Sequence, residues 1–436
     1  MRKPKSDWTD VLLAFRMILE PRKVWLAFNG VVLSIVAVAA LLAALACAYQ
    51  QFGAYPPAKP EADTWQAVRK GRVADAIVAT RSFLCGLTAR AAEEAETTLL
   101  ARGAVPHQRI VALLSCRALN DLAIIGLAVA FVLLLIWSYY GAAIMRVAAV
   151  EYAIGERIEL KSATAYAWRK HHCVYGPPLG LAIAIVVLGL CIWLAGLLGW
   201  NALILVAALV GLLAAGVAAS VARDRTRSSR AGLAVGLAIL VVLAAVLFAM
   251  DRFGLRIPYV GEVALGLFSP LAFFAGFVAV VTAIWLALGM PLMAGTIAAS
   301  DAGAFDAWSR SFHYLFVHPW RYLAYLFVAA AHGSLCLAFV YLVRVATEWV
   351  TVLPLSIGPL LAVGSASEPL VDFFLALDHV LLDLLFLSFA AAYFFTVMTI
   401  VYFLLRHRSD GTPITEVHLE PRDQDRVKPA PAPRPS

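Results

Sequence analysis

Two ionisable side chains in the last two long apolar segments are the strongest candidates for chemistry in this sequence. Arg344 lies near the end of one segment and Asp383 near the start of the next. Charged groups in apolar surroundings are costly and are usually retained for a purpose. Consecutive antiparallel helices would bring the two side chains to a similar depth, where we expect an ion pair. Glu348, Asp378 and His379 could extend this pair, either as a structural clamp or as part of a proton or solute pathway.

The remaining histidines and cysteines offer weaker chemistry. His332 stands near the middle of its apolar segment, where a hydrogen bond to a neighbouring carbonyl is a better interpretation than a proton relay. Residues 171–173 read His-His-Cys, but adjacent residues of a helix point in different directions and cannot converge on a metal. Cys85 and Cys116 could form a disulfide or remain two buried thiols. We predict neither a metal site nor a bound cofactor.

The sequence also lacks the short motifs that mark most enzymes. It contains no GxxxxGK[ST] phosphate loop, no HExxH zinc motif, no GxSxG nucleophile and no CxxC pair. Its basic residues border apolar segments and do not form the broad positive face that nucleic acid requires. We therefore predict a non-enzymatic protein that does not bind nucleic acid.

Composition determines the elements that must position these residues. The chain has 436 residues, of which 62% are hydrophobic and only 14% are charged. A soluble domain is about 45–50% apolar and about 25% charged, which excludes an ordinary soluble enzyme, a disordered chain and a disulfide-rich miniprotein. A helix needs about 20 apolar residues to cross a bilayer. We predict an all-α, polytopic integral membrane protein with about eight transmembrane helices, at residues 24–48, 122–145, 179–200, 203–222, 231–250, 267–298, 322–345 and 380–405.

The distribution of lysine and arginine predicts the orientation of these helices. Most of the 35 basic residues fall in segments on one side of the predicted bilayer, which identifies that side as cytoplasmic. Both termini are then predicted to lie in the cytoplasm. One cytoplasmic loop carries four arginines that could bind anionic lipid headgroups: Arg223, Arg225, Arg227 and Arg230.

Five segments follow from these predictions. Residues 1–23 form an N-terminal cytoplasmic interfacial helix, and residues 24–49 form the first transmembrane helix. Residues 50–117 form an extracytoplasmic helical loop. A seven-span membrane domain covers residues 118–405. The tail at 406–436 is predicted to be disordered and cytoplasmic, because it ends in a proline-rich run without apolar periodicity.

One arrangement recurs three times: an amphipathic helix, then a proline, then an apolar segment. The proline is Pro21, Pro177 or Pro319. Proline ends a helix and lets the chain turn into the bilayer, so we expect the three helices to lie flat in the headgroup region on the cytoplasmic side. Their lipid-facing aromatic residues would be Trp8, Phe15, Tyr166, Phe305, Trp308 and Phe312. The second and third copies belong to similar units at 122–200 and 267–345, which suggests a duplication.

Two of these connectors also carry a resemblance to known proteins. Residues 20–25 read Glu-Pro-Arg-Lys-Val-Trp. Residues 305–314 read Phe-Asp-Ala-Trp-Ser-Arg-Ser-Phe-His-Tyr and are followed by Pro319 and Trp320. In these stretches, and in its plan of spans, the chain resembles a broad group of multi-pass bacterial membrane proteins. The resemblance implies that architecture and a location in the bacterial inner membrane, and it implies no particular activity.

The predicted function follows from the side of the membrane on which these helices lie. Three amphipathic helices on the cytoplasmic side, with no polar track through the apolar segments, predict a protein that organises lipid or docks a partner protein. The alternative is a small transporter or permease that uses the polar cluster between the last two spans. The duplicated units and a sixth span that contains Pro270 and Pro291 would suit that alternative.

Overall fold

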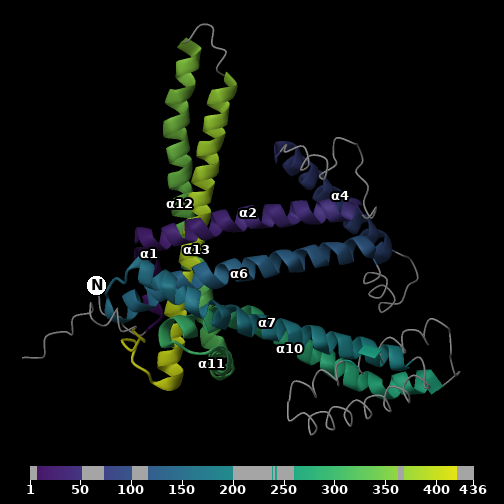
Figure 1. The fold of residues 1–436 in the computed structure, drawn as a ribbon. Helices are drawn as coiled ribbons and strands as arrows, with labels where there is room; N and C mark the ends of the chain where they lie inside the picture. The colour runs from purple at the N-terminus through teal and green to yellow at the C-terminus, as the bar shows by residue number, and fades with distance from the viewer. Residues whose placement is uncertain are drawn as a thin grey trace, which may run out of the picture. The chain divides into compact units, whose positions relative to one another are not determined.

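The computed structural model describes residues 7–51, 73–100, 116–199, 238, 241–242, 260–361 and 368–419 of the chain. Within this part all regular structure is helical, as the composition predicts. The helices, shown in Figure 1, are η1 (Trp8–Leu12), α1 (Leu13–Ile18), α2 (Pro21–Gln51), α4 (Val73–Leu100), α6 (Arg117–Ile154), α7 (Leu160–Gly199), α10 (Val260–Ser300), α11 (Ala304–Val317), α12 (Pro319–Leu361) and α13 (Glu368–Asp410).

Six stretches of helix are long and apolar enough to cross a membrane, which is the architecture of a multi-pass helical membrane protein. They are Pro21–Gln51, Arg117–Ile154, Leu160–Ile192, Ser269–Ser300, Pro319–Thr351 and Phe374–Asp410. Each overlaps one predicted span. The other two predicted spans, at 203–222 and 231–250, lie outside the described residues except for positions 238, 241 and 242. The count of eight spans therefore stays a prediction.

The three prolines of the recurring arrangement do not act alike. Pro21 and Pro319 are the first residues of α2 and α12, the helix position where a missing N–H costs nothing. Pro177 lies inside α7, which continues as a helix on both sides of it. The prediction of a separate second interfacial helix is therefore wrong. Within a long apolar helix a proline removes one backbone hydrogen bond, and the neighbouring turns can maintain the helix.

The described residues form two compact units. The smaller unit, residues 178–290, contains the second part of α7 and the first part of α10. A Cβ at Gly276 would lie 3.9 Å from Ile192 Cδ1, so these two helices are within van der Waals reach of each other. The larger unit, residues 1–177 and 291–436, holds all the contacts discussed below.

Three helices of the larger unit, α2, α6 and α13, contact one another and form its core. We call this core the hub and define it by residues 23–34, 138–153 and 388–406, where buried side chains concentrate. A Cβ at Gly141 would lie only 2.5 Å from the Phe395 ring, so glycine allows α6 and α13 to approach. Phe395 also stacks on Trp137, with ring centroids 5.3 Å apart. The N-terminal η1 packs on α12 and α13, and α1 packs on α13.

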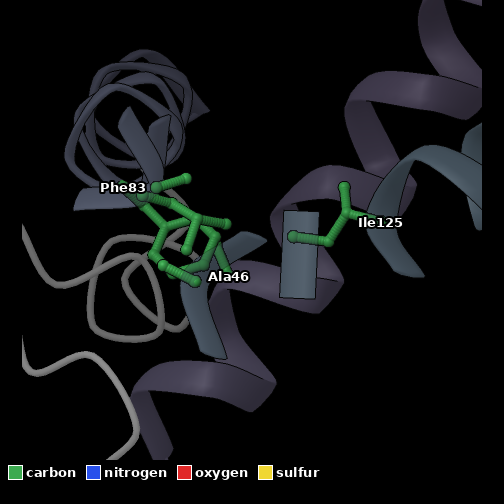
Figure 2. Packing of buried hydrophobic residues seen from close by; sticks show 6 residues of the cluster. Ala46, Phe83 and Ile125 are labelled. Carbon is green, nitrogen blue, oxygen red and sulfur yellow. The ribbon is translucent and has the colours of Figure 1, made fainter. Parts of the chain in front are cut away.

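The helix α4 lies in the segment predicted as an extracytoplasmic helical loop, and it packs on α2 and α6. The contact is a small apolar cluster that includes Ala46, Phe83 and Ile125 (Figure 2). The Glu94 carboxylate accepts a hydrogen bond of 3.1 Å from the Ala118 N–H and so caps the first turn of α6. α4 therefore braces the pair of helices at the ends remote from the hub.

The prediction of a disordered tail from residue 406 is wrong for its first part. α13 continues to Asp410, and residues 411–419 fold back toward the helix ends. The buried Arg406 guanidinium donates to the carbonyls of Pro413, at 3.2 Å, and Glu416. This segment has little apolar periodicity and is ordered because a buried arginine binds its backbone. Residues 420–436 lie outside the described part of the chain.

Candidate functional site

The helix α11 has three faces, whereas its periodicity predicts only an apolar and a polar one. The buried face consists of Ala307, Ser311, Tyr314 and Leu315. The aromatic face consists of Phe305, Trp308, Phe312 and Phe316. The polar face consists of Asp306, Ser309, Arg310 and His313. At about 100° per residue, the aromatic face is turned about 120° from the buried one, so it points away from the core.

The aromatic face of α11 is a continuous row of rings. The centroids of neighbouring rings along it lie 6.0, 5.9 and 6.4 Å apart. Phe305 is 77% exposed and Phe316 62% exposed, and Trp308 is also exposed. Phe312, between them, is half-buried. Three of the predicted lipid-facing residues (Phe305, Trp308 and Phe312) thus share one outward surface.

The buried face anchors α11 to α12 and α13. The Tyr314 hydroxyl donates to the Asp410 carboxylate at 2.5 Å. Burial of Tyr314, followed by this hydrogen bond, raises the pKa of its hydroxyl, which therefore stays protonated and remains a donor. On the polar face Arg310 donates to Asp306 at 2.8 Å, and this hydrogen bond raises the pKa of the guanidinium. The helix is held by one face while its aromatic face stays outward.

The other predicted lipid-facing residues have different surroundings. Trp8 is exposed on η1. Phe15 is half-buried and packs edge-on against Phe339 and Phe389, with centroids 6.3 and 6.0 Å away. Tyr166 is only 2% exposed, so the expectation that it faces lipid is wrong. Helical periodicity places a residue on an apolar face, but that face can meet another helix as well as lipid.

The buried Tyr166 belongs to a set of donors that caps the C-terminal end of α10. The last carbonyls of a helix have no partner within it. Here the carbonyl of Ile297 accepts from the Tyr166 hydroxyl at 2.5 Å, and that of Ala298 accepts from Arg146 Nη1 at 2.8 Å. The next carbonyl, of Ala299, accepts from the His418 N–H at 2.8 Å. Three distant segments thus meet at one helix end.

Two cations reinforce this cap electrostatically. The Arg146 guanidinium lies 4.5 Å from the centroid of the Tyr166 ring. The Lys170 ammonium is 3.0 Å from the Asp301 carboxylate and 3.1 Å from the Asp301 carbonyl. Asp301 adopts φ = 57°, a left-handed conformation that aspartate tolerates better than most residues. Positive charge is favourable at a helix C-terminus, and Arg146 and Lys170 supply it to α10. Sequence periodicity did not predict this role, because both residues are distant from α10 in the chain.

Lys23 forms a second set of buried contacts between helices, which the sequence did not predict. Its ammonium group is fully buried, pairs with Glu151 and lies 3.6 Å from Glu20. It also donates to the Met17 carbonyl at 2.8 Å. Beside it, Arg22 donates to the Ile158 carbonyl at 2.6 Å. The Glu-Pro-Arg-Lys stretch that carries the resemblance therefore fastens the start of α2 to α1 and to the end of α6.

The structure brings Arg344, Asp383, Glu348 and His379 together between α12 and α13. Arg344 pairs with Asp383 at 2.6 Å and with Glu348 at 3.2 Å. His379 Nε2 lies 2.9 Å from the Glu348 carboxylate, and its Nδ1 lies 2.6 Å from the Leu375 carbonyl. Asp378 is exposed and is not among the described contacts of this cluster. These contacts link α12 to α13 and place oppositely charged side chains within ion-pair distance.

His332 belongs to a short hydrogen-bonded chain between the same two helices. Tyr393 donates its hydroxyl proton to the Ala329 carbonyl at 2.8 Å. The hydroxyl oxygen can then accept from His332 Nδ1, 3.0 Å away. The Cys336 thiol lies 3.4 Å from Nε2 and can donate to it. The chain ends on a backbone carbonyl, so in this arrangement a neutral histidine has its ring nitrogens satisfied.

The remaining candidate residues are two cysteines and a cluster of arginines. Cys85 is exposed and Cys116 is buried, and no disulfide joins them, so of the two alternatives the possible disulfide is not formed and only Cys116 is a buried thiol. The arginine cluster at 223–230 lies outside the described residues. Among the residues that are described, no three His, Cys, Asp or Glu side chains gather as a metal site would require.

Comparison of the chain with protein-family models, curated proteins and solved structures finds no significant match.

Proposed function

We propose that the protein is a non-enzymatic, multi-pass protein of the bacterial inner membrane, with both termini in the cytoplasm. Its cytoplasmic helices would organise lipid or dock a partner protein. The observation that carries this proposal is α11, which is anchored through Tyr314 and presents Phe305, Trp308 and Phe316 outward. A helix held by one face and aromatic on another is suited to binding at the membrane surface.

The test removes the aromatic face and leaves the buried face intact. The double variant Phe305→Ser/Trp308→Ser, purified with its surrounding membrane in polymer nanodiscs, should lose lipid or protein that the unmodified chain retains. Mass spectrometry of both fractions measures the loss. The matched control is Trp349→Ser/Phe374→Ser, which removes exposed rings from α12 and α13 instead. An unchanged set of lipids and proteins in the first variant would refute the proposal.

A small transporter or permease is the second candidate function. The observation in its favour is the cluster of Arg344, Asp383, Glu348 and His379, because ionisable groups within apolar helices often belong to solute or proton pathways. The double variant Arg344→Gln/Asp383→Asn removes a cation and an anion together, so the fold should survive. Solute flux in reconstituted vesicles should then be abolished, and normal flux would eliminate this candidate.

A further inference from the structure

Exposed apolar side chains follow the aromatic face of α11 along the chain and into α12. Only His318 separates the two helices, and its backbone angles, φ = −132° and ψ = 53°, are not helical. After it, Trp320 is 81% exposed and Phe327 is 75% exposed, and Leu323 between them is also exposed. Positions 320, 323 and 327 have the i, i+3, i+7 spacing of one helix face. Exposed apolar residues thus lie on both sides of His318, and those after it belong to a helix that is long enough to span a membrane.

The short connection between α11 and α12 limits what can cover the aromatic face. α12 is a candidate membrane span from Pro319 onward, so its exposed face meets acyl chains in the proposed topology. Phe316 lies only three residues before Pro319, which places it within one helical turn of the start of that span. Aromatic rings at such a boundary favour the headgroup layer, where apolar and wet surroundings meet. A soluble partner would have to reach a surface that already borders lipid.

The charged side chains fit the same location. Arg310 and Asp306 neutralise each other on the polar face, which therefore carries no strong attraction for a charged protein surface. Arg321 is exposed directly after Trp320. An arginine at a membrane boundary can lay its apolar stem along the acyl chains and keep its guanidinium among the headgroups. Each of the three faces of α11 then has a matching environment: protein, lipid and water.

We infer that the partner of the aromatic face is the bilayer itself, with α11 lying in the headgroup layer at the foot of α12. The inference rests on the proposed function and deepens it, because it selects lipid over a docked protein. It predicts that Phe305, Phe316 and Trp320 contact phospholipid in the native membrane. It also predicts that Ser309, on the polar face of α11, does not.

Photocrosslinking in intact cells tests this prediction on the full chain. The photoreactive residue p-benzoylphenylalanine replaces Phe305, Phe316 or Trp320 one at a time, so that a large ring replaces a ring. Ser309 provides the polar-face control and Phe327 the control within the span. Mass spectrometry of the irradiated peptides identifies each adduct as phospholipid or polypeptide. We expect phospholipid adducts at the three aromatic positions and at Phe327, in severalfold higher yield than at Ser309.

Three outcomes would overturn the inference. Polypeptide adducts at Phe305 and Phe316 would show a docked protein, and the proposed function would survive in that form. Phospholipid adducts at Phe327 alone would place α11 in water. Equal lipid yields at Ser309 and Phe305 would show that the helix is not oriented by its aromatic face. The nanodisc comparison decides separately whether the aromatic face is needed to retain lipid or protein.

Discussion

The Tyr314 hydroxyl donates to the Asp410 carboxylate at 2.5 Å and joins α11 to the last residue of α13. The two residues are 96 positions apart in the chain. At the turn between α10 and α11, which directly precedes α11, Lys170 pairs with Asp301. The orientation of α11 on the larger unit thus depends on a few polar contacts between distant segments, and its aromatic face is outward because its buried face is fixed.

Tyr314→Phe should loosen α11 while leaving the rest of the larger unit folded. The variant removes the donor to Asp410, and a hydrogen bond to a charged group contributes about 1.5–3 kcal/mol. Hydrogen exchange in detergent micelles should show faster exchange across residues 304–317 than in the unmodified chain. Tyr341→Phe is the control, since Tyr341 is exposed on α12. Equal exchange rates in both variants would mean that the hydroxyl does not anchor the helix.

Lys23→Met should destabilise the hub strongly. It leaves Glu151 buried without its cation, and breaking a buried ion pair in this way costs about 3–5 kcal/mol. Removing both charges of this pair, as Lys23→Met/Glu151→Gln, should recover part of that loss, while Glu20 keeps Arg22 at 3.8 Å as its remaining cation. Thermal unfolding of the single and double variants measures the coupling. A double variant as unstable as the single one would show that the pair is not the source of the effect.

The buried contact of Lys23 with Glu151 and the cap at the end of α10 show why the sequence predicts the helices better than the contacts between them. Apolar length predicts all six candidate spans among the described residues, because the length of an apolar run is a local property of the sequence. The Arg344–Asp383 pair was also predictable, since neighbouring antiparallel helices share depth. Lys23 and Arg146 lie at the ends of apolar segments and are buried. At such positions the sequence does not distinguish a basic residue that only marks the cytoplasmic side from one that is buried in an ion pair or a cap. The partner of Lys23, Glu151, lies 128 residues away, and no local period connects them.

Aromatic residues show the same limit. Phe305 and Tyr166 both lie on apolar stripes that precede a proline, yet one is 77% exposed and the other is buried. The difference arises from α10, whose end offers a carbonyl to the Tyr166 hydroxyl. Only the packing of the helices decides which stripe meets protein. Apolar stripes can therefore be predicted from the sequence, but which of them remains exposed cannot.

Arg146→Met should weaken the cap at the end of α10. Methionine fills the space of the arginine stem but leaves the Ala298 carbonyl without this donor, and an unsatisfied buried group costs about 1–3 kcal/mol. The midpoint of thermal unfolding should fall, and Tyr166→Phe should lower it by a smaller amount. Arg157→Met is the matched control, because Arg157 is exposed just after α6. If the control falls as far as Arg146→Met, the cap does not contribute to stability.

Gly333→Ala should displace Tyr393 and open the contact between α12 and α13. A Cβ at Gly333 would lie 2.5 Å from the Tyr393 ring, and overpacking of this kind costs about 1–3 kcal/mol. Gly180→Ala is the matched control, because no atom lies within 4 Å of its Cβ position; it should be neutral or slightly stabilising.

The same substitution also bears on His332. When Tyr393 moves, its hydroxyl loses the Ala329 carbonyl and the His332 ring. Tyr393→Phe removes the same bonds, so its cost should be smaller in the Gly333→Ala background than alone, a sub-additive result in a double-mutant cycle. Thermal unfolding of the four proteins measures the cycle. Full additivity would show that the alanine methyl is accommodated without moving the tyrosine, and the close approach of α12 and α13 at Gly333 would then not depend on glycine.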